Sequence, residues 1–254
     1  MNPFDVRGRR VLVTGSTRGI GAAVVRLLSQ LGAEVIVHGT LTGNAGPALV
    51  AELRAAGGRA ELIRADLTEW AAGEALVAAS EDALGPLDGV VLNHGVWYAA
   101  PLESLEEDAW RSMARANLDG FFSVGAAAAK RMKARGAGTI VLVSSTAGQR
   151  GEAFHSTYAA TKGAIISMTK SWASELAPAG VRVNCVAPGW VATPMTVEAL
   201  ENAEVRASVE QSIPLRRVAR PEEIAAPIAF LLSDAASFMH GEIMNVNGGA
   251  VLVG

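Results

Sequence analysis

Residues 11–21 read VLVTGSTRGIG, a short apolar run followed at once by a glycine-rich turn. Apolar residues then recur at helical spacing from Ile20 to Leu31, and Gly32 marks the expected end of that helix. Glycines let the backbone turn sharply and approach a bound group closely, and a helix N-terminus adds free N–H groups and a partial positive charge. The stretch therefore predicts a strand, a phosphate-binding turn and a helix.

The glycines of this turn are spaced G-x-x-x-G-x-G, which differs from the G-x-G-x-x-G of the general dinucleotide fingerprint. A glycine-rich turn without a ligand is the alternative interpretation, and the strand and helix on either side favour a binding site. The cofactor-binding residues expected here are Gly15, Ser16, Thr17, Arg18, Gly19, Ile20 and Gly21.

Beyond the turn, short β-branched runs alternate with helical patterns along the whole chain. The expected strands span 11–14, 34–37, 60–64, 89–92, 139–143, 181–186 and 243–246. Several of these runs are apolar throughout, as strands buried on both faces are. The rhythm predicts an α/β fold, a Rossmann-type doubly wound parallel sheet of about seven strands with helices on both faces, in one domain over residues 1–254.

Three local patterns refine this picture. Residues 104–107, SLEE, match a capping box that would open a long helix toward Lys133. Pro221, followed by two glutamates, is expected to open another helix. Residues 195–212 interrupt the rhythm with a polar, helix-prone segment, which we interpret as a substrate lid; an ordinary surface helix is the alternative.

Composition restricts the classes of function. The chain has 254 residues, of which 50% are hydrophobic, and a net charge of −3, so nucleic acid and anionic membrane surfaces are not expected partners. No apolar run is long enough to span a bilayer, and the first residues lack the apolar core of a secretion signal. Cys185 is the single cysteine, which fits a reducing cytoplasm, and we expect no metal site.

The end of the second expected strand bears on the choice of cofactor. Sites selective for NAD commonly place an acid there to hold the ribose hydroxyls. This chain has Gly39 and Thr40 instead and no acid, which leaves Arg18 and Thr40 to meet a 2′-phosphate. The sequence therefore favours NADP(H) over NAD(H).

Tyr158 and Lys162 lie four residues apart in a helical pattern, so both side chains project from one helix face. A free phenol has a pKa of about 10, and a cation within about 4–6 Å lowers it toward the range useful for general acid–base chemistry. Ser144 and Ser145 end the preceding strand, where either hydroxyl could bind a substrate oxygen. A surface Tyr–Lys pair is the alternative, because such pairs are common.

Several motifs, in order, resemble those of the short-chain dehydrogenase/reductase family over essentially the whole chain. They are TGSTRGIG at 14–21, ADL at 65–67, NHG at 93–95, SS at 144–145, YAATK at 158–162 and PGWVATPM at 188–195. Within the family, the chain looks closest to the 3-oxoacyl-carrier-protein reductase-like and the sugar or polyol dehydrogenase branches.

The resemblance implies a role for each matching residue. Ser145 would hold the carbonyl or hydroxyl oxygen, Tyr158 would transfer the proton, and Lys162 would bind the nicotinamide ribose and tune the tyrosine. Asn117 would support a proton-relay water, completing the catalytic set. The further cofactor contacts that the resemblance implies are Asp66, Leu67, Asn93, Gly95, Pro188, Gly189, Val191 and Thr193.

His94 departs from the family's Asn-Asn-Ala-Gly motif, and we expect it to pack or to act behind the residues that touch the cofactor; direct contact with cofactor or substrate is the alternative. The activity so implied is NADP(H)-dependent interconversion of a carbonyl and a secondary alcohol, of the 3-oxoacyl reductase or related ketone reductase kind. An NAD-dependent sugar, polyol or cyclic-alcohol dehydrogenase is the alternative, and a catalytically idle nucleotide-binding scaffold is a remote one. The family resemblance further implies a homotetramer that acts on a small molecule.

Overall fold

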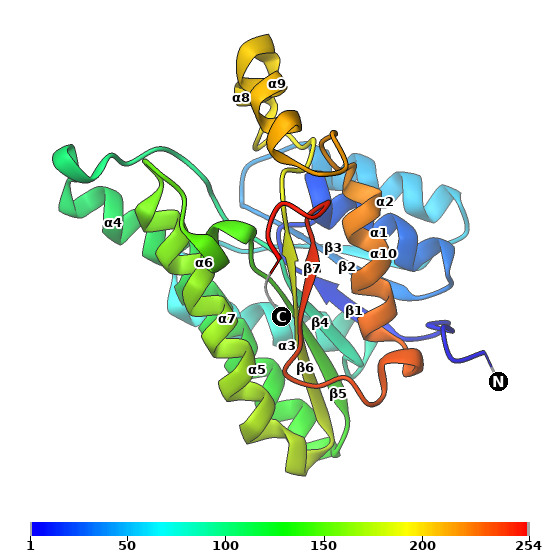
Figure 1. Ribbon diagram of the computed structural model, residues 1–254. Coiled ribbons are helices and arrows are strands. Elements are labelled where there is room, and N and C mark those ends of the chain that lie inside the picture. Colours follow the sequence, from blue (N-terminus) through cyan, green and yellow to red (C-terminus); the bar gives the residue numbers. More distant parts are fainter. Residues whose placement is uncertain (1, 253–254) are drawn as a thin grey trace.

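The computed structural model describes residues 2–252, and its centre is a sheet of seven strands that all run parallel (Figure 1). The strands are β1 (Arg10–Val13), β2 (Glu34–Gly39), β3 (Ala60–Arg64), β4 (Gly89–Leu92), β5 (Gly138–Val143), β6 (Val181–Pro188) and β7 (Ile243–Val246). Their order across the sheet is β3-β2-β1-β4-β5-β6-β7. The predicted doubly wound parallel sheet is confirmed.

Alternate residues of each strand serve two separate cores, because side chains of a strand point to opposite faces. Val11 and Val13 pack in one core, and Leu12 packs in the other. The first core is covered by α1 (Gly19–Gln30), α2 (Ala45–Ala55) and α10 (Pro221–Leu232). The second is covered by α3 (Trp70–Leu84), α5 (Gly120–Arg135) and α7 (Ser156–Leu176), and Figure 1 shows α1, α2 and α10 on one side of the sheet and α5 and α7 on the other.

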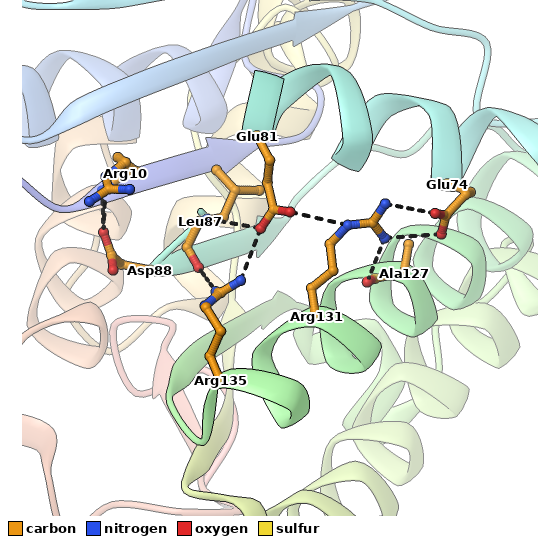
Figure 2. A network of polar contacts seen from close by, with 8 residues as sticks. All are labelled: Arg10, Glu74, Glu81, Leu87, Asp88, Ala127, Arg131 and Arg135. Carbon is orange, nitrogen blue, oxygen red and sulfur yellow. Dashed lines mark hydrogen bonds and ion pairs between the residues drawn. The ribbon is translucent and has the colours of Figure 1, made fainter. Parts of the chain in front are cut away.

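Charged side chains join α3 to α5 outside the second core (Figure 2). Arg131 reaches Glu74 at 2.7 Å and Glu81 at 3.1 Å, and Arg135 reaches the same Glu81 at 3.0 Å. Glu81 also accepts a hydrogen bond from the Leu87 N–H, at the entrance to β4. One carboxylate thus links two helices and the loop that leads into the sheet.

The helix expected from residue 104 toward Lys133 is interrupted and begins later. Residues Leu102–Ser104 form a short 3-10 turn, and α4 (Glu107–Ala114) begins after Glu106, whose side chain makes no capping bond. The predicted capping box at 104–107 is therefore wrong, because Ser104 ends the 3-10 turn instead of capping the helix. A π-helical turn, Arg115–Asp119, then joins α4 to α5.

The remaining elements lie at the carboxyl end of the sheet or connect its layers. They are α6 (Thr146–Arg150), α8 (Val197–Glu201), α9 (Ala203–Ser212) and the 3-10 turns Ala177–Ala179 and Asp234–Ala236. Pro221 opens α10, as predicted. Helices α8 and α9 project from the body at the top of Figure 1. Within residues 2–252, no helix has the length and apolar character needed to cross a bilayer.

Candidate active site

A cleft of about 510 Å³ opens at the carboxyl ends of the strands and gathers most of the residues singled out from the sequence. Those that line it are Gly15, Thr17, Arg18, Gly19, Ile20, Gly39, Thr40, Asp66, Leu67, Asn93, Gly95, Ser145, Tyr158, Lys162, Pro188, Gly189, Val191 and Thr193. Segments from seven parts of the chain therefore meet at one edge of the sheet, as the topology of a doubly wound sheet requires.

Three predicted residues lie behind the cleft instead. The Ser16 hydroxyl is buried and donates to the Val13 carbonyl at 2.7 Å. A Cβ on Gly21 would lie 2.5 Å from the Gly15 carbonyl oxygen, so only glycine lets α1 approach the turn this closely. Asn117, the third, is fully buried beneath the loop after β4. Their positions support the cleft without facing it.

The glycine-rich turn leaves the first N–H groups of α1 open. Arg18 precedes the helix and makes no side-chain cap, and its own side chain is exposed at the cleft. Gly15 has a φ of 61°, a left-handed conformation that favours glycine, and a Cβ there would lie 2.7 Å from the His94 Cα. Uncapped N–H groups at a helix N-terminus suit a phosphate, so the residues present fit a dinucleotide.

Ser145, Tyr158 and Lys162 share the inner part of the cleft. The Ser145 oxygen accepts a hydrogen bond from the Ala147 N–H at 3.1 Å, which begins α6. The Lys162 Nζ donates to the Val143 carbonyl at 3.0 Å and lies 5.7 Å from the centroid of the Tyr158 ring. The three side chains come from the end of β5 and the first turns of α7, where the sheet edge and the helix meet.

Burial controls the acidity of this group. It raises the pKa of Tyr158 to about 12, against a smaller opposing effect of a hydrogen bond with Ser145. It also lowers the pKa of Lys162 to about 8, because an ammonium loses its hydration in the protein interior. The pKa of Tyr158 is therefore raised and not lowered as expected, because desolvation of the phenol is the largest effect. The Lys162 ammonium donates instead to the Val143 carbonyl.

Asn117 owes its position to the π-helical turn. Its Oδ1 accepts from the Val96 N–H at 2.8 Å, and its Nδ2 donates to the Val96 carbonyl at 3.0 Å and to the Thr161 hydroxyl at 3.2 Å. Asn117 therefore clamps the loop after β4 to the helix that carries Tyr158 and Lys162. A Cβ on Gly95 would lie 3.0 Å from the same Oδ1 and 3.7 Å from the Lys162 Nζ.

Two histidines, buried His38 and half-buried His94, lie at the cleft, and only His94 was considered from the sequence. The His94 ring is tilted by 43° against Phe121, with ring centroids 4.7 Å apart, and its Nδ1 lies 2.8 Å from the Thr14 hydroxyl. His38 accepts a hydrogen bond from the Gly15 N–H through its Nδ1 at 3.0 Å. Burial lowers the pKa of both rings, to about 4 for His38, so both are neutral near pH 7.

The cleft also includes residues that sequence reasoning did not single out as cofactor or catalytic contacts. Apart from the two histidines, they include Thr42, Gly43, Asn44, Ala45, Ala65, Thr68, Val96, Ala116, Val143 and Pro194. Ser144, which was considered beside Ser145, and Met195 and Thr196 of the expected lid also line the cleft. Residues 42–45 belong to the same loop as Thr40 and the start of the next helix, so the whole loop after the second strand could have been predicted to line the cofactor site.

Aromatic side chains gather around His155, three residues before Tyr158 in the chain. Trp97 stacks on His155 with ring centroids 4.6 Å apart and an angle of 1° between planes, and Trp190 meets Trp97 edge-on at 5.8 Å. Glu152 lies 3.8 Å from the His155 ring and close enough to Tyr158 to raise its pKa. Trp190 also packs against the cluster that α9 forms with the segment after it, so this aromatic group connects the 195–212 segment with the cleft.

Comparison with known proteins agrees with this geometry. A family described as enoyl-(acyl carrier protein) reductase matches residues 15–251. The chain is 42% identical to cis-4-hydroxycyclohexanecarboxylate dehydrogenase of Sinomonas cyclohexanicum, over 96% of this chain and 97% of that protein. It is 36% identical to the 3-oxoacyl-[acyl-carrier-protein] reductase FabG of Vibrio harveyi, over 98% and 100%.

A solved structure extends the likeness to the fold. Gluconate 5-dehydrogenase from Burkholderia cenocepacia, in complex with NADP and tartrate, superposes with a TM-score of 0.93 at 32% identity, over 98% of this chain and 97% of that one. These likenesses cover nearly the entire length of each protein. The chain therefore belongs to the short-chain dehydrogenase/reductase family of NAD(P)-dependent oxidoreductases, which act on CH–OH groups.

Proposed function

We propose that this enzyme interconverts a ketone and a secondary alcohol with NADP(H), and that Tyr158 is its general acid and base. The observation that carries the proposal is the meeting of Ser145, Tyr158 and Lys162 in one cleft with an uncapped helix N-terminus. With a pKa raised to about 12, Tyr158 is protonated near neutrality, which is the form that a proton donor needs at the start of a reduction.

In the reductive direction each side chain has a distinct task. The Ser145 oxygen already accepts from the Ala147 N–H, so its own proton is available to a carbonyl oxygen of the substrate. Tyr158 gives its proton to that oxygen as negative charge develops there. The Lys162 ammonium, buried nearby, stabilises the phenolate that remains. Asn117 holds the loop and helix in place, and we propose that it supports the water that returns the proton.

Cofactor selection is proposed to favour NADP(H). When bound, the nicotinamide supplies or accepts the hydride. The end of β2 carries no acid, and a Cβ on Gly39 would lie 2.5 Å from the Thr17 methyl carbon, so a larger residue would not fit without a shift. Arg18 is exposed at the cleft and pairs with no acid in residues 2–252, which leaves its guanidinium for a 2′-phosphate.

The other cofactor contacts follow from the cleft and the family. We propose that Asp66 and Leu67 lie beside the adenine, that Asn93 and Gly95 face the adenosine portion, and that Pro188, Gly189, Val191 and Thr193 position the nicotinamide. Residues 195–212 are proposed as the substrate lid within a single domain. A homotetramer in the cytoplasm is proposed from the family alone.

Substitution of the proton donor tests the central claim. Tyr158→Phe should bind NADPH with an affinity within about twofold of wild type but lose nearly all turnover, because only the hydroxyl is removed. Binding is measured by quenching of tryptophan fluorescence, and turnover by the absorbance of the reduced nicotinamide over a panel of ketones. Near-normal turnover in the variant would refute the assignment.

The aromatic group of Trp97, His155 and Trp190 favours a second candidate, oxidation of a sugar, polyol or cyclic alcohol with NAD⁺. Tryptophan faces bind the apolar faces of rings, and the half-buried Glu152 would accept hydrogen bonds from hydroxyl groups. Comparison of NADPH with NADH, each against acyclic β-keto thioesters, cyclic ketones and sugar lactones, separates the two candidates.

A further inference from the structure

Arg64, at the end of β3, holds the loop between β2 and α2 from behind. It lies in register with Gly39, the last residue of β2, so its side chain stands where the loop begins. The guanidinium donates to the carbonyls of Thr40 at 3.3 Å, Leu41 at 3.1 Å and Gly43 at 2.7 Å. One planar, permanently charged group thus fixes three peptide units of a five-residue connection, residues 40–44.

These hydrogen bonds determine where the loop's N–H groups point. In a trans peptide the C=O of one residue and the N–H of the next point in opposite directions. Because the carbonyls of residues 40, 41 and 43 face Arg64, the N–H groups of Leu41, Thr42 and Asn44 face away from it. None of these three N–H groups has an acceptor within residues 2–252.

The side of the loop opposite Arg64 is the cleft. Thr40, Thr42, Gly43 and Asn44 line the cleft, and Arg64 does not. Arg18 lines the same cleft from the glycine-rich turn. Residues 40–45 carry no acid, and α2 begins at Ala45 without a side-chain cap, which adds the positive end of a helix.

We infer that Arg64 is a positioning residue for the selection of NADP(H): by holding three carbonyls it aims the N–H groups of residues 40–44 at the part of the cleft where the 2′-phosphate is proposed to bind. Convergent main-chain N–H groups form concave sites for anions. Arg18 contributes a direct charge from the opposite wall, whereas Arg64 acts through the loop. The inference deepens the proposed function and rests on its use of NADP(H).

A fragment pair isolates the phosphate from the rest of the cofactor. Adenosine 2′,5′-bisphosphate and 5′-AMP differ only in the 2′-phosphate, so the ratio of their dissociation constants measures this site. Wild type should bind the bisphosphate at least about tenfold more tightly, as one or two charge-assisted hydrogen bonds predict. Isothermal titration of the full chain gives both constants.

Variants of Arg64 then test the positioning role. Arg64→Gln should lose most of the preference, while binding of 5′-AMP stays within about twofold. Arg64→Lys keeps the charge but not the three-carbonyl geometry, and should lose the preference as well. Arg59→Gln is the matched control, because Arg59 precedes the same strand and donates to Glu34 and the Ala83 carbonyl, so it should keep the wild-type ratio.

Each contrary result has a separate meaning. A wild-type chain that binds both fragments equally would refute the proposed NADP(H) preference and this site with it. A wild-type preference that survives in Arg64→Gln would overturn the role of Arg64 alone. Equal weakening of both fragments in Arg64→Gln would also overturn it, because Arg64 would then support the fold and not the phosphate.

Discussion

His38 provides a test of how burial controls the cleft floor. It is 3% exposed; its Nδ1 accepts from the Gly15 N–H, and its Nε2 lies 3.2 Å from the Ala65 carbonyl oxygen. An Nδ1 that accepts carries no proton, so the neutral ring holds its proton on Nε2 and donates it to Ala65. Protonation at Nδ1 would break the contact with the phosphate-binding turn, and burial accordingly lowers the pKa of His38 to about 4.

The sign and size of the effect on stability follow from this pKa. Between pH 6.5 and 4 the unfolded chain binds the His38 proton and the folded chain does not, so stability falls as the pH falls through that window. Over the whole window His38 contributes about 3 kcal/mol to the change in the free energy of unfolding, and from pH 7 to pH 5 it contributes about 2 kcal/mol. Other groups titrate in the same range, so the contribution of His38 must be isolated by substitution.

His38→Asn removes the titration and keeps an acceptor near Nδ1. The free energy of unfolding is measured in urea at pH 7 and pH 5, and the difference between the two should be smaller in the variant by about 2 kcal/mol. A loss of stability that is equal at both pH values does not change the difference between the two unfolding free energies. His155→Asn is the control, because His155 packs on Trp97 and does not line the cleft. An unchanged difference in His38→Asn would refute the reasoning that burial keeps this ring neutral.

Three further predictions concern the cofactor, the lysine and a helix pair. Thr40→Asp replaces an exposed side chain of the cleft wall by a carboxylate where the 2′-phosphate is proposed to bind, and it should raise the KM for NADPH at least about tenfold, as steady-state kinetics would show. Burial lowers the pKa of Lys162 to about 8, so the charged form of this side chain disappears above that pH. The value of kcat/KM for NADPH should therefore fall about tenfold for each pH unit above pH 8. A profile that stays flat to about pH 9.5 would contradict this prediction. Arg131→Met removes the ion pairs between α5 and α3 and should lower the free energy of unfolding in urea by about 1 kcal/mol; no loss would mean that solvent screens them fully.

The strands were predictable because each is a short apolar run with a local end signal. The strand expected at 60–64 has those bounds in β3, and the one at 89–92 has those bounds in β4. The strand expected at 181–186 continues to Pro188 in β6, because β7 pairs with those last residues. Strand ends depend on the neighbouring strand, which a single segment does not reveal.

Contacts between segments far apart in the sequence could not be predicted from local sequence patterns. Neither the bond from Gly15 to His38 nor the grip of Arg64 on residues 40–44 leaves a local pattern, because each depends on which strands become neighbours. The prediction of a lowered pKa for Tyr158 failed for a related reason. Helical spacing correctly places Lys162 one turn away, but the desolvation that dominates the pKa comes from the surrounding layers.

The π-helical turn shows how a local irregularity can serve a site. A π turn inserts one residue into an otherwise α-helical path and rotates everything beyond it by about 100° relative to the helix before it. Here the insertion lies at Arg115–Asp119, where Asn117 turns inward to hold Val96 and Thr161. Met113 of α4 and Phe121 of α5 are fully buried on either side of this turn. The π turn thus places one polar side chain beneath the cleft while its apolar neighbours remain buried.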